Sequence, residues 1–267
     1  MNNNEMSMYE FFESINFTPP HMQFLKYTFD NEKKIEEKFK NYRGATEYIF
    51  DALNFLLIRY SAYYDHFYLV KDRPYNGLLW TAFIKNSYSF YSAFDMTKQG
   101  LYGSARVLLR YIYEFLIISK YVAVSKDVSL YNGWNSGKGI WMSSDVLKKI
   151  VKPNVTEIKT LWETLCRFTH SSITSQQSGI EYSEYHEKEI EFNYVIIWVM
   201  MEMSYHLLNR YILTSRLSYY LRNYGDYSQI KCVLKYIREG FNYTRKIMGK
   251  DSRLLVKNYK EDWIIKS

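Results

Sequence analysis

Five charged or titratable side chains stand on otherwise apolar stretches of this chain, and they are the candidates for a chemical role. They are Arg106, Arg110, Glu114, Arg167 and His170. A histidine can exchange a proton near neutral pH, and an arginine can hold an anion through several N–H donors. These groups are the minimum apparatus for cutting a phosphodiester bond. The set therefore indicates a site for an anionic substrate.

Three of these residues follow one another at four-residue steps: Arg106, Arg110 and Glu114. In a helix, residues four apart lie on one stripe of the surface. Apolar neighbours bound this stripe, so we expect part of it to be drawn inside, where an unpaired charge costs several kcal/mol. Other parts of the chain must then supply partners. If Arg110 and Glu114 form a buried pair, Arg110→Ala would cost about 3 to 5 kcal/mol.

The other two candidates stand at the end of a predicted helix over residues 157–172, which carries Arg167 and His170. If this helix packs antiparallel to the one over residues 102–125, Arg167 and His170 face the region of Arg110. A purely structural alternative stays open, in which Arg110 pairs with Glu114 and the helix dipole favours His170 near a C-terminus.

The elements that must position these residues are helices. The chain has 11 Gly and 4 Pro in 267 residues, and few obligatory turns favour long helices over a many-stranded sheet. We expect one all-α domain, a multi-helix bundle with peripheral N- and C-terminal helices. Its parts are an N-terminal helical extension over residues 1–74, a core over 75–222 and a C-terminal tail over 223–267. Apolar spacing predicts helices over residues 21–41, 46–70, 75–99, 102–125, 145–151, 157–172 and 187–220. The helices over 75–99 and 102–125 are separated by a break at Gly100 to Gly103. A Gly- and Asn-rich connection follows residue 125, and we expect two more helical segments after residue 226.

The charge and composition of the chain indicate which classes of binding partner are allowed. The net charge is +7 and the pI is about 9.0, so RNA, DNA or a membrane surface is an allowed partner. The uncharged run over residues 192–201 is shorter than the roughly 20 residues that cross a bilayer, so we expect no membrane span. Two cysteines make no disulfide framework, which fits a cytoplasmic protein.

No spacing typical of a metal or cofactor site is found in the sequence. The five histidines are scattered, and no His-x3-His or Cys-x2-Cys pair occurs. The string Gly133-Trp-Asn-Ser-Gly-Lys-Gly139 lacks the spacing of a phosphate-binding loop. We therefore expect no metal and no cofactor.

The run from Ser92 to Leu116 resembles the first helical hairpin of HEPN-type domains. There, a helix ends near a Gly-x-Tyr motif and an Ala-containing helix with a Glu follows. The chain is more similar still to an uncharacterised bacterial helical family. In that family, a helix that contains a Leu-Leu-Arg motif and a Glu precedes a segment with the pattern Leu-x-x-x-x-His-x-Ser. In this chain the segment is Leu165 to Ser172. The likeness covers roughly residues 75–215.

The resemblance implies a metal-independent endoribonuclease of a bacterial toxin or phage-defence system. By this likeness, His170 would act as acid and base in attack by the RNA 2′-hydroxyl, and Arg167 would stabilise charge on the phosphate. Arg106, Arg110 and Glu114 would be the supporting polar cluster. Such domains pair as homodimers in which two Arg/His sets share a cleft, and a regulatory or neutralising protein is a further expected partner.

A second hypothesis concerns the same residues. Arg167 and His170 stand closer in sequence than in the HEPN nuclease motif, and several HEPN-like domains bind partners without cutting RNA. The alternative is a non-catalytic helical module that binds a protein partner, a nucleic acid or a nucleotide. In that case the Arg, Glu and His side chains form a structural network.

Overall fold

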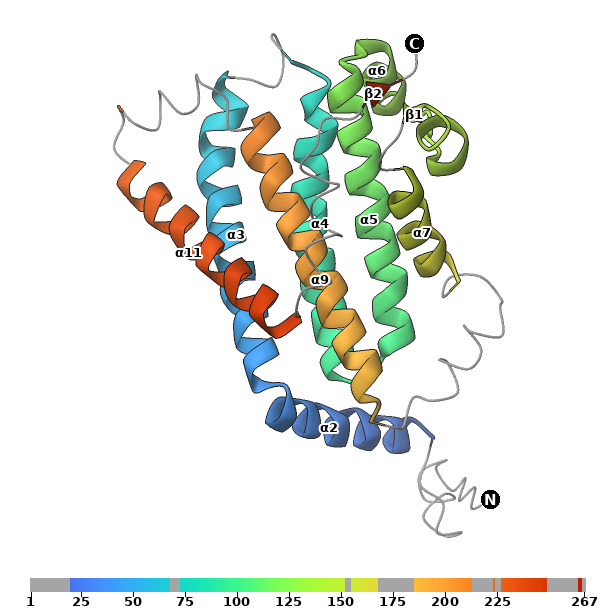
Figure 1. Ribbon diagram of the computed structural model, residues 1–267, viewed down its shortest axis with the longest axis vertical. Coiled ribbons are helices and arrows are strands. Elements are labelled where there is room, and N and C mark those ends of the chain that lie inside the picture. The colour runs from blue at the N-terminus through green and yellow to red at the C-terminus, as the bar shows by residue number, and fades with distance from the viewer. Residues whose placement is uncertain are drawn as a thin grey trace, which may run out of the picture.

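The computed structural model is a bundle of long helices lying side by side (Figure 1). It describes residues 20–67, 73–151, 155–167, 185–212, 223, 227–248 and 264–265. The helices are α2 (Pro20–Lys38), α3 (Lys40–Phe67), α4 (Asn76–Lys98), α5 (Tyr102–Ser125), α6 (Val128–Asn135), α7 (Val155–Cys166), α9 (Glu187–Leu207) and α11 (Tyr227–Met248). Two π-helical turns, η1 (Met142–Val146) and η2 (Leu208–Ile212), and two short strands, β1 (Ile150–Val151) and β2 (Ile264–Ile265), complete the described chain. The predicted all-α multi-helix bundle is confirmed.

The helices α3, α4, α5 and α9 run along the length of the molecule, and α2 crosses their lower end (Figure 1). Helix α11 flanks α3 at one side of the bundle, and α7 flanks α5 at the other. Buried residues of α2, α3 and α11 belong to the same hydrophobic cluster as those of α4, α5 and α9. The domain boundaries at residues 74 and 222 stay a prediction.

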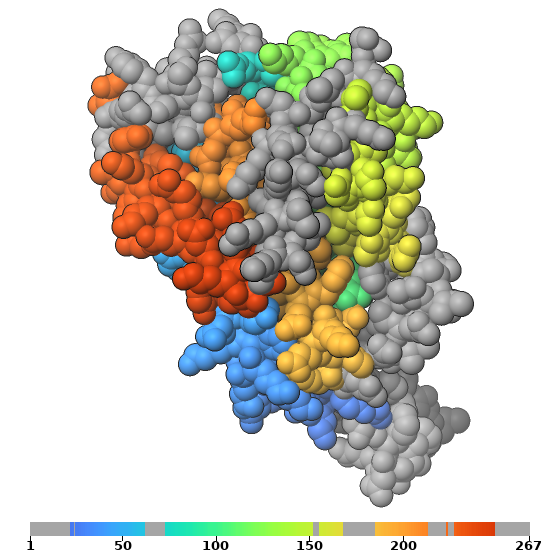
Figure 2. All heavy atoms as spheres, in the orientation of Figure 1, coloured from blue at the N-terminus to red at the C-terminus, as the bar shows by residue number. Residues whose placement is uncertain are grey.

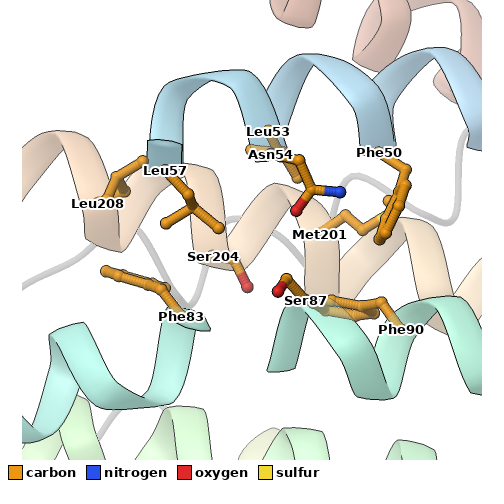
Figure 3. A pocket seen from close by; sticks show the side chains of 10 residues that line it. All are labelled: Phe50, Leu53, Asn54, Leu57, Phe83, Ser87, Phe90, Met201, Ser204 and Leu208. Atoms are coloured by element: carbon orange, nitrogen blue, oxygen red, sulfur yellow. The ribbon is translucent and has the colours of Figure 1, made fainter. Parts of the chain in front are cut away.

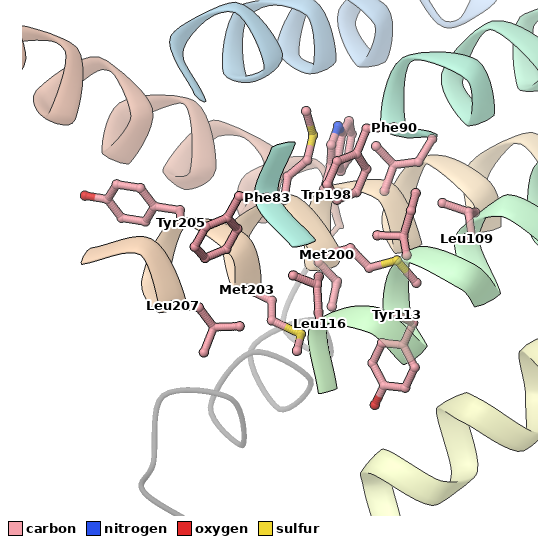
Figure 4. Packing of buried hydrophobic residues seen from close by; sticks show 14 of the residues in the cluster. Phe83, Phe90, Leu109, Tyr113, Leu116, Trp198, Met200, Met203, Tyr205 and Leu207 are labelled. Carbon is pink, nitrogen blue, oxygen red and sulfur yellow. The ribbon is translucent and has the colours of Figure 1, made fainter. Parts of the chain in front are cut away.

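Helix α9 lies at the centre of this cluster because it is apolar around most of its circumference. Figure 4 shows Trp198, Met200 and Met203 of α9 packed among side chains of α4 and α5. The indole N–H of Trp198 donates to Thr46 Oγ1 of α3 at 2.8 Å. No helix in the described part of the chain is long and apolar enough to cross a membrane.

The predicted break between α4 and α5 is at Gly100. This residue has φ +81°, a left-handed conformation that favours glycine, and a Cβ there would lie 2.7 Å from the amide nitrogen of Asn31 in α2. Gly103, which we grouped with it, lies inside the first turn of α5. The turn therefore needs one glycine, and that glycine also lets α2 approach closely.

One prediction for the stretch after α5 is wrong. The expected helix over residues 145–151 is replaced by η1 and by β1, whose Ile150 pairs with Ile265 of β2. Asp145 accepts a hydrogen bond from the backbone N–H of Trp141 at 2.8 Å, so its side chain binds the turn before it. The Gly- and Asn-rich connection after residue 125 contains α6, which begins where Asp127 accepts a hydrogen bond from Ser129 N at 2.8 Å.

Other helix limits differ from the expected ones. Helix α3 begins at Lys40 rather than at residue 46, directly after a bend at Phe39 that separates it from α2. The expected helix over 157–172 is described as α7 up to Cys166, and the one over 187–220 as α9 and η2 up to Ile212. Their predicted ends, and most of the second helical segment expected after 226, fall outside the described residues, although residues 264–265 form β2.

The packing of α11 on α3 can be tested at Gly240. A Cβ on this glycine would lie 2.8 Å from Cγ1 of Ile49, so a larger side chain must push the two helices apart. We expect Gly240→Val to lower the free energy of unfolding by about 2 kcal/mol, measured by urea denaturation.

The matched control is Gly44→Ala in α3, where nothing lies within 4 Å of the added Cβ. This change should raise stability by up to about 1 kcal/mol, because alanine has the higher helix propensity. Equal stability of the two variants would contradict the close approach of α11 to α3.

Candidate functional site

Arg106 is buried where α5 meets α9, with about 2% of its surface exposed. Its guanidinium forms an ion pair with Glu189 in the first turn of α9. Its Nε–H donates to Asn193 Oδ1 at 3.0 Å, and the guanidinium lies 4.8 Å from the centre of the Phe192 ring. The expectation that another part of the chain must supply a partner for Arg106 is confirmed.

Asn193 extends this contact to a third helix. Its amide nitrogen lies 3.3 Å from Thr97 Oγ1 of α4 and 3.3 Å from the carbonyl oxygen of Tyr102 in α5. Both acceptors stand beside the turn at Gly100. Arg106, Glu189 and Asn193 therefore tie α9 to the hairpin of α4 and α5, a network that we call the Arg106 network.

Burial sets the protonation of groups around the Arg106 network. It lowers the pKa of Arg106, which the charge of Glu189 opposes, and an arginine in such a pair stays protonated. Burial raises the pKa of the Tyr102 hydroxyl to about 12, although the backbone of His186 opposes the shift. Tyr102 is therefore neutral near pH 7, and this network is suited to holding the fold rather than to moving protons.

Arg110 and Glu114 lie one and two turns further along α5, where α7 packs against it. Arg110 lies 3.3 Å from Glu114 Oε2, and the side chains are 29% and 24% exposed. Tyr113, between them, donates to the carbonyl oxygen of Ile158 in α7 at 3.3 Å. We call Arg110, Glu114 and the facing end of α7 the α5/α7 junction.

Cys166, the last residue of α7, lies against this pair. Burial raises the pKa of its thiol, while Arg110 opposes the shift through its charge and through a hydrogen bond. The buried Nε–H of Arg110 has no hydrogen-bond partner among the described residues. An unpaired N–H of this kind is suited to donate a hydrogen bond to a ligand oxygen.

Arg167 is the exposed residue directly after Cys166. Its backbone N–H donates to Glu163 O at 3.2 Å, so it continues the last turn of α7. The structure thus places the end of α7 at Arg110, as the antiparallel packing predicted. His170 lies outside the described residues.

The three residues that we predicted to share one stripe of α5 have different surroundings. Arg106 is turned toward α9, whereas Arg110 and Glu114 lie at the α5/α7 junction with Cys166. Because Arg110 and Glu114 are about a quarter exposed, water screens their charges. The cost of 3 to 5 kcal/mol that a fully buried pair would imply for Arg110→Ala is therefore too high, and about 1 kcal/mol is expected.

A second buried ionic contact was missed in the sequence. Glu202 of α9 is 2% exposed and forms an ion pair with Arg245 of α11, and His206 Nε2 lies 3.3 Å from its Oε1. The signal was present as a Glu and a His four residues apart within an apolar helix. Arg245 could not be assigned from spacing, since it is 43 residues away.

The described surface also has a groove between α3 and α4, with α9 as its floor. Its outer part, of about 600 Å³, is lined by apolar side chains that include Ile58, Ile84 and Tyr88. A small inner cavity of about 20 Å³ lies beneath it, and Figure 3 shows the Asn54 amide pointing into this space. The size and lining resemble those of sites for an apolar partner.

Comparisons of the chain with family models, with curated proteins and with solved structures gave no match.

The Arg106 network can be tested by removing its cation. Arg106→Ala removes the cation that pairs with Glu189 and the donor to Asn193 Oδ1, so we expect a loss of about 3 kcal/mol in the free energy of unfolding. Thermal and urea denaturation would measure it.

Lys159→Ala is the control for a solvated pair, since Lys159 and Glu163 are 55% and 50% exposed and 3.6 Å apart. Its cost should stay below about 1 kcal/mol. If Arg106→Ala cost no more than Lys159→Ala, the Arg106 network would not hold the three helices together.

Proposed function

We propose that this chain is a metal-independent endoribonuclease of a bacterial toxin or phage-defence system, acting in the cytoplasm. The α5/α7 junction is its proposed site. His170 is the proposed acid and base, and Arg167 the proposed phosphate stabiliser, as the resemblance to HEPN-type domains implies. The resemblance also implies a homodimer in which two such sets share a cleft.

One observation carries the proposal: Arg110 and Glu114 lie against Cys166, the residue before Arg167. Chain continuity keeps Arg167 at this end of α7. Arg110 on α5 and Arg167 after α7, which are 57 residues apart in sequence, thus lie toward the same end of α7. This is the arrangement that a shared phosphate site requires.

The junction offers guanidinium N–H donors to an anion. Arg110 holds a single carboxylate, Glu114, and has a buried Nε–H without a partner in the described part of the chain. Arg167 brings a second guanidinium to the same end of α7. The carboxylates of Glu114 and Glu163 also lie near Cys166, so the guanidiniums would stabilise the charge that builds up on a phosphate through directed N–H donors rather than through an excess of positive charge.

The proposed chemistry needs these groups and no external oxidant or reductant. His170 takes the proton of a 2′-hydroxyl, and the resulting oxygen attacks the adjacent phosphorus. The bond to the 5′-oxygen breaks, and that oxygen receives a proton from the imidazolium. The products carry a 2′,3′-cyclic phosphate and a 5′-hydroxyl, while the arginines hold the phosphate oxygens.

A second candidate function is a non-catalytic helical module, and the apolar groove between α3 and α4 is the observation that favours it. An amphipathic helix of a regulatory protein would fit such a groove with its apolar face inward. In this case the Arg, Glu and His residues stabilise the fold, and purified protein cuts no RNA.

We expect wild-type protein to cleave a mixed pool of tRNA and single-stranded RNA in EDTA, and His170→Ala to abolish cleavage. Arg110→Ala should reduce the rate at least tenfold, while its melting temperature stays within a few degrees of wild type. A denaturing gel reads the cleavage, and direct labelling by a polynucleotide kinase reads the 5′-hydroxyl ends.

Lys159→Ala on the exposed surface of α7 is the matched control and should cleave like wild type. Undiminished cleavage by His170→Ala would rule out its role as acid and base. Absence of cleavage by every form would favour the binding module.

A further inference from the structure

Helix α11 presents the most one-sided surface of the described helices. It buries a narrow stripe against α3 and α9, consisting of Ile230, Ile237, Gly240, Phe241 and Thr244. The exposed residues of the helix lie on its outward side, and the helix forms a continuous part of the surface in Figure 2. It carries five basic residues and one acidic residue, a net charge of +4, where the whole chain has a net charge of +7.

The basic residues form a row. Lys231, Lys235, Arg238 and Lys246 are all exposed, and their spacing places them along one side of the helix. The row is about 22 Å long at 1.5 Å per residue. The fifth basic residue, Arg245, is turned inward to Glu202 and is not part of the row.

A row of tyrosines runs beside the basic row. Tyr236 and Tyr243 are 46% and 44% exposed and stand seven residues apart, on the same side of the helix. Tyr48 of α3, itself exposed, meets the Tyr236 ring edge to face at 6.0 Å between centroids. This contact holds the Tyr236 ring in place, and both Tyr236 and Tyr243 stay partly exposed to solvent.

Acidic residues neutralise little of the positive charge on the outward face of α11. Glu239, the acidic residue of α11, lies 3.8 Å from Lys235, and both side chains are more than half exposed. Such a solvated pair is weak and can exchange for a stronger anion. The acidic Glu202 is buried and is already bound by Arg245 and His206.

We infer that the outward face of α11 binds single-stranded RNA, with phosphates along the row of Lys and Arg and bases against Tyr236 and Tyr243. Cationic grooves with aromatic platforms are how proteins hold unpaired strands without sequence preference. A membrane surface fits less well, because an interfacial helix buries an apolar face in lipid and that of α11 is buried in the bundle.

This inference rests on the proposed function in that RNA is the substrate. It adds a holding surface on the side of the bundle opposite α7 (Figure 1). A strand held there would be anchored at a distance from the α5/α7 junction. Weakening this anchor should therefore reduce RNA binding without removing the groups that cleave.

The test uses a fluorescein-labelled 20-nucleotide RNA that is 2′-O-methylated throughout, since it has no attacking hydroxyl and is not cleaved. Fluorescence anisotropy gives the dissociation constant of full-length protein at several salt concentrations. We expect K231Q/K235Q/K246Q to weaken binding at least tenfold and to make the slope of log K against log salt shallower by about 2. Tyr236→Ala and Tyr243→Ala should each weaken binding at least fivefold.

Matched controls are K26Q/K33Q/K34Q, which removes three exposed charges from α2, and Tyr88→Ala, which removes a 75% exposed ring from α4. Circular dichroism and melting confirm that each variant folds. Equal weakening by the α2 triple variant would show that only net charge matters, and this would overturn the inference.

Two further measurements, of lipid binding and of RNA cleavage, distinguish this inference from the alternatives. Binding to phosphatidylserine vesicles that depends on Lys231, Lys235 and Lys246, without RNA binding, would overturn the inference in favour of a lipid surface. If RNA binds through α11 but is never cleaved in unmodified form, the inference stands and the proposed ribonuclease fails. If the α11 variants bind and cleave RNA like wild type, the inference fails and the ribonuclease stands.

Discussion

The fold depends on one buried contact, the ion pair of Arg106 with Glu189 together with the amide of Asn193. A guanidinium that is almost fully buried must be paired, because its desolvation otherwise costs several kcal/mol. The pair can form only when the first turn of α9 lies against the turn between α4 and α5. This requirement fixes how far α9 is inserted into the bundle. Since Arg110 and Glu114 lie on the same helix as Arg106, the contact also fixes which part of α5 is presented to α7.

Much of the fold could be predicted from the sequence, because helical spacing and scarce glycines are local signals. The hairpin of α4 and α5 is found as expected, and the spacing of Arg110 and Glu114 correctly gave an ion pair. The direction in which each charged side chain points could not be predicted.

Arg106 and Arg110 are four residues apart, yet one faces α9 and the other faces α7. The partners are 83 and 56 residues distant, and no local pattern identifies them. The short π-helical turn and strand after α6 were missed because a side-chain bond of Asp145 and pairing with β2 override helix propensity there.

The two ionic contacts of α9 have different consequences for function. Both Glu189 and Glu202 bind an arginine from another helix, and each partner is thereby fixed in place. Their arginines are committed to the fold, and neither is available to hold a substrate phosphate. Arg110 differs because neither member of its ion pair is buried, whereas Arg106 and Glu202 are almost fully buried, and because its Nε–H is unpaired within the described chain. The distinction between structural and functional arginines therefore rests on burial and on unused donors rather than on sequence position.

The two cysteines provide the most direct test that RNA occupies both surfaces. Cys166 lies at Arg110 in the α5/α7 junction, and Cys232 is exposed on α11 beside the basic row. Alkylation rates of both thiols would be measured by mass spectrometry with and without the 2′-O-methylated RNA. We predict that saturating RNA slows alkylation of both, with Arg110→Ala removing the protection of Cys166 and leaving that of Cys232. Unchanged alkylation of Cys166 in wild-type protein, under conditions where RNA is bound, would contradict a substrate site at the α5/α7 junction.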